Sequence, residues 1–246
     1  MNQFFQRSIA AAAAALALTA GLAAGAAETQ SSSMPILMYH DLTQDPNKTS
    51  SMTVTDERFR LDMEFLESFG YTPLFPSEVE EIGEGKRSLP ARPVMITFDD
   101  GYLSNYEYAW PILEKYGMVA TIFMVGATTG NTEHYKDTAY PITPHFSYEQ
   151  GAEMVASGVI SLQSHTYDMH QWGPYESTDQ PRETILPLEG ESEADYRASL
   201  SADCQKIRQA IQNGTGEENV HVIAYPSGRY NSLAQVTLLE NGFDIS

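Results

Sequence analysis

The sequence predicts an α/β fold in which parallel strands are joined by crossover helices. From residue 34 onward, short apolar runs of strand length alternate with longer segments whose apolar residues recur at helical spacing. Each short run is bounded by Gly, Pro or polar residues, as strands in such proteins are. A chain of 246 residues is long enough for one sizeable core, so we expect a single folded domain.

The N-terminal segment has the composition of a secretory signal. Arg7 supplies a positive charge, residues 8–22 are mostly Ala and Leu, and small residues over 24–26 offer a cleavage site. We therefore expect a signal peptide over residues 1–27, a domain over residues 28–246, and a secreted or cell-envelope location. The alternative is an uncleaved anchor, for which the apolar run is short; no later segment is expected to span a membrane.

Six apolar runs are predicted to form strands. Because they follow one another in parallel order, they favour a barrel. The runs cover residues 35–39, 71–74, 93–98, 120–125, 160–163 and 220–225.

Three helices are predicted between these strands. The first follows Thr55 as N-cap and ends at Gly70, the second follows Ser147 and ends at Gly158, and the third lies within residues 191–213. Their expected core residues are Phe59, Met63, Leu66 and Phe69 in the first and Tyr196, Leu200, Cys204, Ile207 and Ile211 in the third. Two long polar segments, 126–146 and 167–188, follow strands and are expected to form binding loops.

Composition excludes several classes of function. The formal net charge is −19, from 14 basic and 33 acidic residues, so nucleic acid is not an expected partner. Cys204 is the only cysteine, so no intrachain disulfide can form. The fold must be held by core packing or by a metal.

Two adjacent carboxylates follow the third predicted strand. Asp99 and Asp100 stand in the segment Thr-Phe-Asp-Asp-Gly-Tyr, with Gly101 permitting a tight turn. Like charges at one strand end repel unless a cation compensates them, so the pair favours a metal site. An Asp-Asp turn that caps the next helix is the alternative.

Two histidines follow the fifth predicted strand. His165 and His170 are five positions apart on a loop, and imidazole with carboxylate suits zinc. Asp100, His165 and His170 would supply three protein ligands and leave an open position, as catalytic zinc sites do. Asp99 would then be available as a base. The remaining histidines at 134, 145 and 221 are interpreted as ordinary surface or core residues.

A turn follows the sixth predicted strand. Residues 225–228 read Tyr-Pro-Ser-Gly, and a turn of this kind can direct a backbone N–H into a site or simply reverse the chain.

Taken in order, these three motifs resemble the NodB-like polysaccharide deacetylases, carbohydrate esterase family 4, from about residue 34 to residue 246. The resemblance implies a distorted (β/α)7 TIM-like barrel with Asp99 as catalytic base. It implies that Asp100, His165 and His170 bind a divalent metal ion, with Zn²⁺ expected, and that the Ser227 N–H stabilises the oxyanion. Further substrate contacts are expected from the remaining motif residues His40, Tyr225, Pro226 and Gly228.

The strand ending Met38-Tyr39-His40 and the spacing of the two histidines resemble the extracellular poly-N-acetylglucosamine deacetylase branch. The implied reaction is metal-dependent removal of N-acetyl groups from an acetylated polysaccharide outside the cell. Two alternatives stay open: an O-acetyl esterase acting on xylan, and a secreted carbohydrate-binding protein without activity.

The sequence departs from the family pattern at two points. Ala224 stands where many members have the arginine that positions the catalytic aspartate. The chain also stops at Ser246, before the family's Leu-x-His motif, whose histidine serves as general acid. We therefore expect a C-terminally incomplete domain that lacks the last strand or strands of the barrel.

Overall fold

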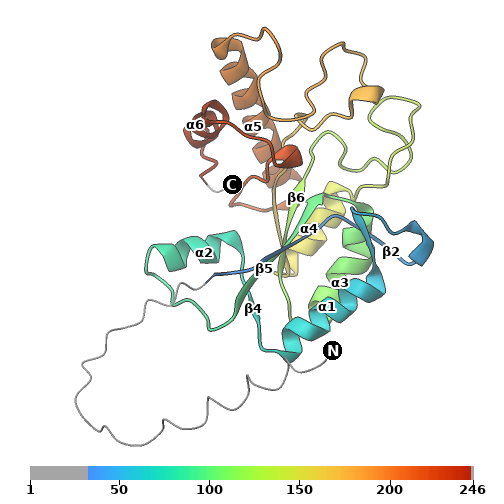
Figure 1. The fold of residues 1–246 in the computed structure, drawn as a ribbon, viewed down its shortest axis with the longest axis vertical. Coiled ribbons are helices and arrows are strands. Elements are labelled where there is room, and N and C mark those ends of the chain that lie inside the picture. The colour runs from blue at the N-terminus through green and yellow to red at the C-terminus, as the bar shows by residue number, and fades with distance from the viewer. Residues whose placement is uncertain (1–32, 245–246) are drawn as a thin grey trace, which may run out of the picture. The chain divides into compact units, whose positions relative to one another are not determined.

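The computed structural model describes residues 33–244, and residues 34–244 belong to one compact unit. The signal peptide predicted over residues 1–27 lies outside the described residues. The strands and the α-helices are shown in Figure 1. They are β1 (Ile36–Tyr39), β2 (Asp41–Thr43), β3 (Thr53–Thr55), α1 (Asp56–Ser68), β4 (Thr72–Pro73), α2 (Pro76–Gly83), β5 (Pro93–Asp100), α3 (Trp110–Lys115), β6 (Ala120–Met124), α4 (Tyr148–Ala156), β7 (Ile160–Ser164), α5 (Glu193–Thr215) and α6 (Ser232–Glu240).

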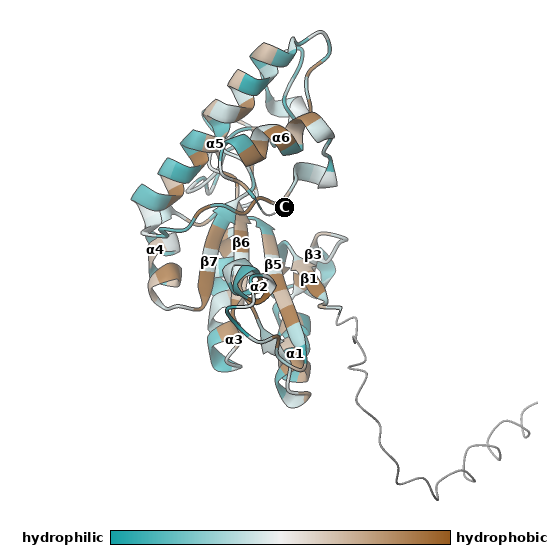
Figure 2. Ribbon diagram, turned by 90° about the vertical axis from the view of Figure 1, so that its left-hand side faces the viewer, coloured by the Kyte–Doolittle hydropathy of each residue, from teal (hydrophilic) through white to brown (hydrophobic). Residues whose placement is uncertain are grey.

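A parallel sheet forms the centre of the unit. Its strands lie in the order β1-β5-β6-β7, with β4 also paired to β5, and every pairing is parallel. Figure 2 shows β5, β6 and β7 side by side with strongly apolar stretches. The short strands β2 and β3 form a separate two-stranded sheet. The predicted α/β class with parallel strands is confirmed.

The predicted barrel is not closed within residues 33–244, where the sheet is open. The expected strand over 220–225 makes one isolated bridge, between Ser164 and Ile223. The Gln163 side-chain oxygen accepts hydrogen bonds from the N–H groups of His221 and Val222, at 3.2 and 3.0 Å. These backbone donors are therefore not free to form a regular ladder. β4 is also shorter than predicted, with two residues, although the Leu74 N–H still donates to the Val94 carbonyl oxygen at 2.9 Å.

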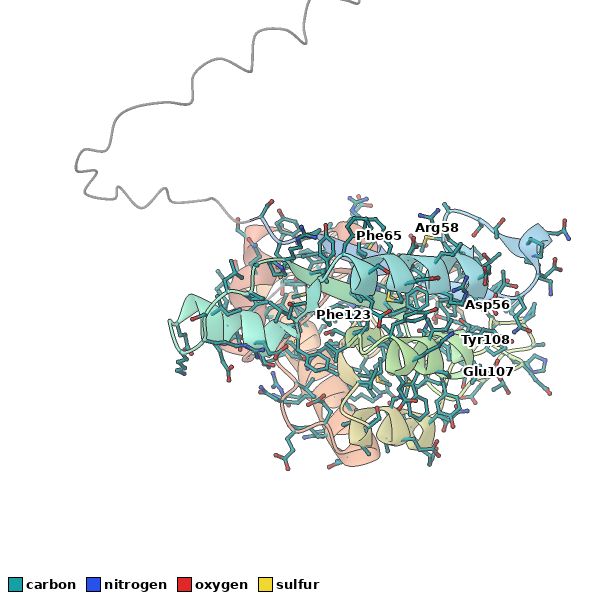
Figure 3. The ribbon with its side chains drawn as sticks, turned by 90° about the horizontal axis from the view of Figure 1, so that it is seen from below. Asp56, Arg58, Phe65, Glu107, Tyr108 and Phe123 are labelled. Carbon is teal, nitrogen blue, oxygen red and sulfur yellow. The ribbon has the colours of Figure 1, made fainter. Side chains whose placement is uncertain are left out.

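Helix α1 forms where its N-cap was predicted. The Thr55 side chain accepts the Arg58 N–H, and Phe59, Met63 and Leu66 are buried on one face. The expectation for Phe69 was wrong: it lies past the last helical turn, is 53% exposed, and packs on exposed Phe65 at 4.4 Å between ring centroids. Figure 3 shows Phe65 on the outer side of α1.

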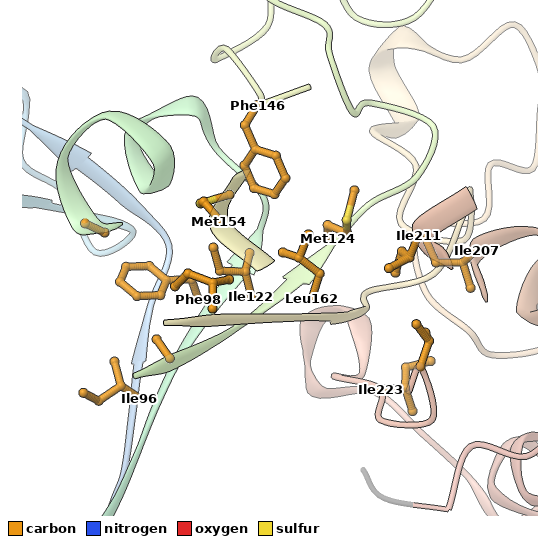
Figure 4. Packing of buried hydrophobic residues seen from close by; sticks show 14 of the residues in the cluster. Ile96, Phe98, Ile122, Met124, Phe146, Met154, Leu162, Ile207, Ile211 and Ile223 are labelled. Atoms are coloured by element: carbon orange, nitrogen blue, oxygen red, sulfur yellow. The ribbon is translucent and has the colours of Figure 1, made fainter. Parts of the chain in front are cut away.

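The core extends from the sheet to α5. Helix α4 begins at the predicted N-cap Ser147, which forms a capping box with Gln150. All five predicted core residues of α5 are buried, including the free thiol of Cys204. Figure 4 shows Phe98, Met124 and Leu162 of the sheet in one group and Ile207 and Ile211 of α5 beyond it. No helix within residues 33–244 is long and apolar enough to cross a membrane.

Strand alternation gives the sheet two different faces. On β5, Val94, Ile96 and Phe98 are fully buried in the core, whereas Met95, Thr97 and Asp99 line a cleft. Helices α1, α3 and α4 cover the core face, and α2 lies on the opposite side (Figures 1 and 2). The second face is therefore open to a ligand.

Candidate active site

The cleft has a volume of about 1150 Å³ and includes the carboxyl ends of the central strands. This is the edge at which parallel α/β folds place their ligands. The two loops predicted to bind, 126–146 and 167–188, contribute to its wall. The predicted site residues that line it are His40, Asp99, Asp100, His165, His170, Tyr225, Ser227 and Gly228.

Asp99 and Asp100 both line the cleft, although adjacent strand residues normally face opposite sides. Asp100 has a φ of 71°, in the left-handed region, which breaks the alternation at the strand end. Gly101 follows with a φ of 84°, and a β-carbon there would lie 3.2 Å from Cβ of Met124. The predicted tight turn therefore requires glycine.

Asp100, His165 and His170 converge from two strand ends. The Asp100 Oδ1 atom lies 3.6 Å from Nε2 of His165 and 3.7 Å from Nε2 of His170. The three ligand atoms all lie within 4.8 Å of one another. The two imidazole rings are perpendicular, with centroids 5.0 Å apart.

Both histidines are held through their other ring nitrogen. Nδ1 of His165 lies 3.0 Å from the Ala224 carbonyl oxygen, and Nδ1 of His170 lies 3.2 Å from that of Glu183. A carbonyl can only accept, so Nδ1 carries a proton in both rings, and Nε2 of each ring faces Asp100. Burial lowers the pKa of His165 to about 4, so this imidazole is neutral at physiological pH.

This donor set fits a divalent metal ion. Two ligands about 2.0–2.1 Å from a tetrahedral ion lie roughly 3.4 Å apart, close to the separations between Asp100 and each imidazole. Two imidazoles and one carboxylate match the preference of zinc.

Asp99 lies beside this group in an unusual electrostatic setting. Burial, followed by the negative charge of Asp100, raises the pKa of Asp99 to about 7. Nε2 of His40 is 3.8 Å from Oδ2 of Asp99, too far for a hydrogen bond. Burial also lowers the pKa of His40, which favours its neutral form. A carboxyl group in this setting can exchange a proton near neutral pH.

The turn over residues 225–228 lines the cleft with three of its four residues. Ser227 has a φ of 56°, and both Ser227 and Gly228 are exposed on the cleft wall. The Tyr225 ring stacks on Tyr230, with centroids 4.8 Å apart. Pro226 is buried under this turn, so its side chain supports the turn instead of facing the cleft.

Three residues near the site make contacts that the sequence analysis did not predict. Tyr102 lines the cleft and hydrogen-bonds Asp100, and burial raises the pKa of its phenol. His145 was interpreted as an ordinary residue; it is buried, lines the cleft and contacts the Tyr102 ring at 5.0 Å. Asp203 on α5 accepts backbone N–H groups from the loop that carries His165 and His170. Only the position of Tyr102, three residues after Asp99, offered a signal in the sequence.

A family model described as polysaccharide deacetylase matches residues 86–245. The protein YxkH of Bacillus subtilis (strain 168) is 33% identical over 198 residues, which cover 80% of this chain and 58% of that protein. The poly-β-1,6-N-acetyl-D-glucosamine N-deacetylase of Escherichia coli (strain K12) is 25% identical over 224 residues, 85% of this chain and 33% of that protein. The chain therefore spans well under two thirds of the length of these two curated relatives.

Solved structures share the fold. The de-N-acetylase from Aggregatibacter actinomycetemcomitans superposes with a TM-score of 0.71 at 22% identity, covering 85% of each chain. IcaB from Ammonifex degensii gives a TM-score of 0.68 at 27% identity, covering 85% of this chain and 81% of that one. Together with the match over residues 86–245, this similarity shows that the chain belongs to the polysaccharide deacetylase family.

Proposed function

We propose that this protein hydrolyses N-acetyl groups of an extracellular amino-sugar polysaccharide and that the reaction depends on a divalent metal ion, with Zn²⁺ as the expected ion. The observation that carries the proposal is the convergence of Asp100, His165 and His170 beside the buried carboxyl group of Asp99. Family membership supports the reaction class. The name of the Escherichia coli relative supports an N-acetylated glucosamine polymer as substrate.

Asp100, His165 and His170 would hold the ion through one carboxylate oxygen and two Nε2 atoms. The ion, when bound, supplies Lewis acidity for the amide carbonyl and lowers the pKa of a nearby water. Asp99 takes the proton from the attacking water, and its raised pKa makes it an effective base near neutral pH. The nearby positive charge of an ion would lower that pKa and favour the ionised base.

The remaining motif residues would stabilise and position the substrate. The Ser227 N–H would donate to the oxygen that becomes negative when the carbonyl is attacked. His40 is a neutral polar group on the cleft wall close to Asp99, suited to a hydroxyl or amide of the sugar. The proton that Asp99 takes from the water is passed to the leaving nitrogen as the C–N bond breaks, so acetate and a free amine are the products.

Aromatic residues at one end of the cleft would bind sugar rings. Trp172 is 60% exposed, lines the cleft and lies 6.3 Å from the ring of Tyr175 between centroids. Tyr175 also stacks on Tyr140 at 4.3 Å. Exposed flat rings in a cleft of this size suit a polymer of sugars.

The test is acetate release from β-1,6-linked N-acetylglucosamine oligomers by residues 28–246, with added Zn²⁺ and with a chelator. Acetylated xylan is the comparison substrate, and Asp99→Asn and His165→Ala are the variants. We expect zinc-dependent release from the amino-sugar oligomers only. Asp99→Asn should abolish release while metal stays bound, whereas His165→Ala should reduce both.

Other outcomes would contradict the proposal. Release from xylan alone would indicate an O-acetyl esterase. Oligomer binding without release from either substrate would indicate a carbohydrate-binding protein. Equal metal loss in both variants would contradict the division of roles between Asp99 and His165.

A further inference from the structure

A carboxylate lies on the apolar face of α5 with no role in the reaction described above. Asp203 is 9% exposed and stands next to Cys204, between the buried residues Leu200 and Ile207. Burying a charged group among apolar side chains costs free energy unless strong hydrogen bonds compensate it. A carboxylate at this position therefore needs hydrogen-bond donors.

Its partners are two consecutive backbone N–H groups between the proposed ligand histidines. Oδ2 of Asp203 accepts the Tyr167 N–H at 2.7 Å, and Oδ1 accepts the Asp168 N–H at 2.8 Å. Hydrogen bonds to an ionised acceptor are roughly twice as strong as neutral ones. Lys206, one turn further along α5, places its ammonium 3.8 Å from the centroid of the Tyr167 ring. Helix α5 thus holds the loop through both backbone and side chain.

The backbone N–H groups of the loop between His165 and His170 are bonded to side-chain acceptors. Besides the two bonds to Asp203, the Thr166 N–H donates to Oγ of Ser164 at 3.0 Å and the Met169 N–H donates to Oγ1 of Thr166 at 3.1 Å. All four backbone N–H groups between His165 and His170 are therefore bonded to side-chain oxygens. Asp203 supplies both of the acceptors that come from outside the loop and its strand.

The loop is also strained. Thr166 has a φ of 76°, a conformation that is unfavourable for a residue with a branched β-carbon and persists only where its surroundings enforce it. This reversal of the chain brings two imidazoles five positions apart to one carboxylate. The two Asp203 acceptors hold this conformation together with the N–H groups of Gly126 and Ala127, which donate to the carbonyl oxygens of Thr166 and Tyr167 at 3.1 and 2.7 Å.

We propose that Asp203 is a positioning residue that fixes His165 and His170 in their metal-binding arrangement by binding the backbone between them. This inference rests on the metal site of the proposed function. It adds a residue that touches neither ion nor substrate and acts from a helix 33 to 38 positions away in the sequence.

The test compares metal affinity of the whole chain in three forms: wild type, Asp203→Asn and Cys204→Ala. Asparagine presents an N–H₂ group to one of the two loop N–H donors, so one bond is lost and one repulsion is introduced. Cys204→Ala is the matched control, because it removes a buried group from the adjacent position, and Cys204 supplies none of the four acceptors described above. Affinity for Zn²⁺ is measured by competition with a chromogenic chelator, and folding by circular dichroism and thermal unfolding.

We expect Asp203→Asn to bind Zn²⁺ roughly 10- to 100-fold more weakly, the usual effect of losing a group that orients a ligand. Its Co²⁺ form should also show a visible absorption spectrum different from that of wild type, because the ligand geometry changes. Cys204→Ala should lose thermal stability but keep wild-type affinity and spectrum. A folded Asp203→Asn protein with wild-type affinity would overturn the proposal.

A measurement on the wild type alone covers the case in which Asp203→Asn does not fold. Hydrogen exchange of the Tyr167 and Asp168 amides is followed in metal-free protein. We expect protection before any metal is added, because Asp203 binds these amides without it. Exchange at the rate of an unstructured peptide would overturn the proposal. If the wild type binds no metal at all, the proposed function fails; the ratio of variant to wild-type affinity tests Asp203 separately.

Discussion

Replacing Asp99 by asparagine should stabilise the metal-free protein at neutral pH. The carboxyl group of Asp99 is buried beside Asp100, and these two causes, in that order, raise its pKa from 3.8 to about 7. In the unfolded chain the group ionises near its ordinary pKa. The folded state therefore binds a proton that the unfolded state has already released, and the asparagine side chain imitates this neutral form.

The sign and size of the effect follow from this difference in pKa. The stabilising contribution of protonated Asp99 is fully present below about pH 4 and is lost as the pH rises to about 7. A shift of about three units, at about 1.4 kcal/mol each, gives an upper limit of about 4 kcal/mol. Partial exposure of the side chain, 12%, makes the measured value smaller. The advantage of Asp99→Asn should grow between pH 4 and pH 7 and then level off.

Urea unfolding in the presence of a chelator, at pH 5 and pH 8, measures the effect. Asp137→Asn, which changes an exposed loop carboxylate, is the control and should match the wild type. Adding Zn²⁺ should reduce the advantage of Asp99→Asn, because a cation compensates the paired carboxylates. The reasoning is refuted if Asp99→Asn is less stable than wild type without metal, or if the difference is the same at both pH values.

Three further predictions concern the turn, the core and the substrate. Gly101→Ala should lower the free energy of unfolding by about 1–2 kcal/mol, measured with urea, because its φ is 84° and Cβ of Met124 blocks the new methyl group; an unchanged midpoint would contradict this. Leu162→Ala should cost about 3 kcal/mol in the same assay, since Leu162 is fully buried in the sheet, and a cost below about 1 kcal/mol would contradict close packing there. Trp172→Ala should raise KM for long oligomers roughly threefold to tenfold at constant kcat, as expected for lost ring stacking; an equal effect on a disaccharide would contradict a role along the polymer.

The sequence predicted the central strands and helices well because N-cap residues and apolar spacing are visible within a short stretch of sequence. The N-cap and apolar spacing of α1 and the N-cap of α4 appear in the structure where the sequence placed them. The strand predicted over residues 220–225 does not form a regular ladder, because the Gln163 side chain binds two of its backbone N–H groups. This competition depends on tertiary contacts. Helices α2, α3 and α6 were not predicted, since each has nine residues or fewer, too few to show a clear period.

For the site, the sequence located the proposed metal ligands but not the residues that hold them in place. Asp100, His165 and His170 follow recognisable apolar strands, and parallel strands bring their ends to one edge. Asp203 could not be recognised, because it occurs in an acidic helix pattern and its partners lie far away in the sequence. His145 and Tyr102 come together through an isolated bridge that no local pattern predicts.

Each of the three motifs around the cleft contains one non-glycine residue in the left-handed region. These are Asp100 at φ 71°, Thr166 at 76° and Ser227 at 56°. Each costs about 1–3 kcal/mol and persists only where its surroundings enforce it. The supports differ: Gly101 provides the turn after Asp100, and Asp203 holds the loop after Thr166. Together with the raised pKa of Asp99, this strain places several unfavourable interactions at the cleft. A ligand that binds the cleft residues in this conformation would offset part of that cost, so metal binding and stability should be strongly coupled.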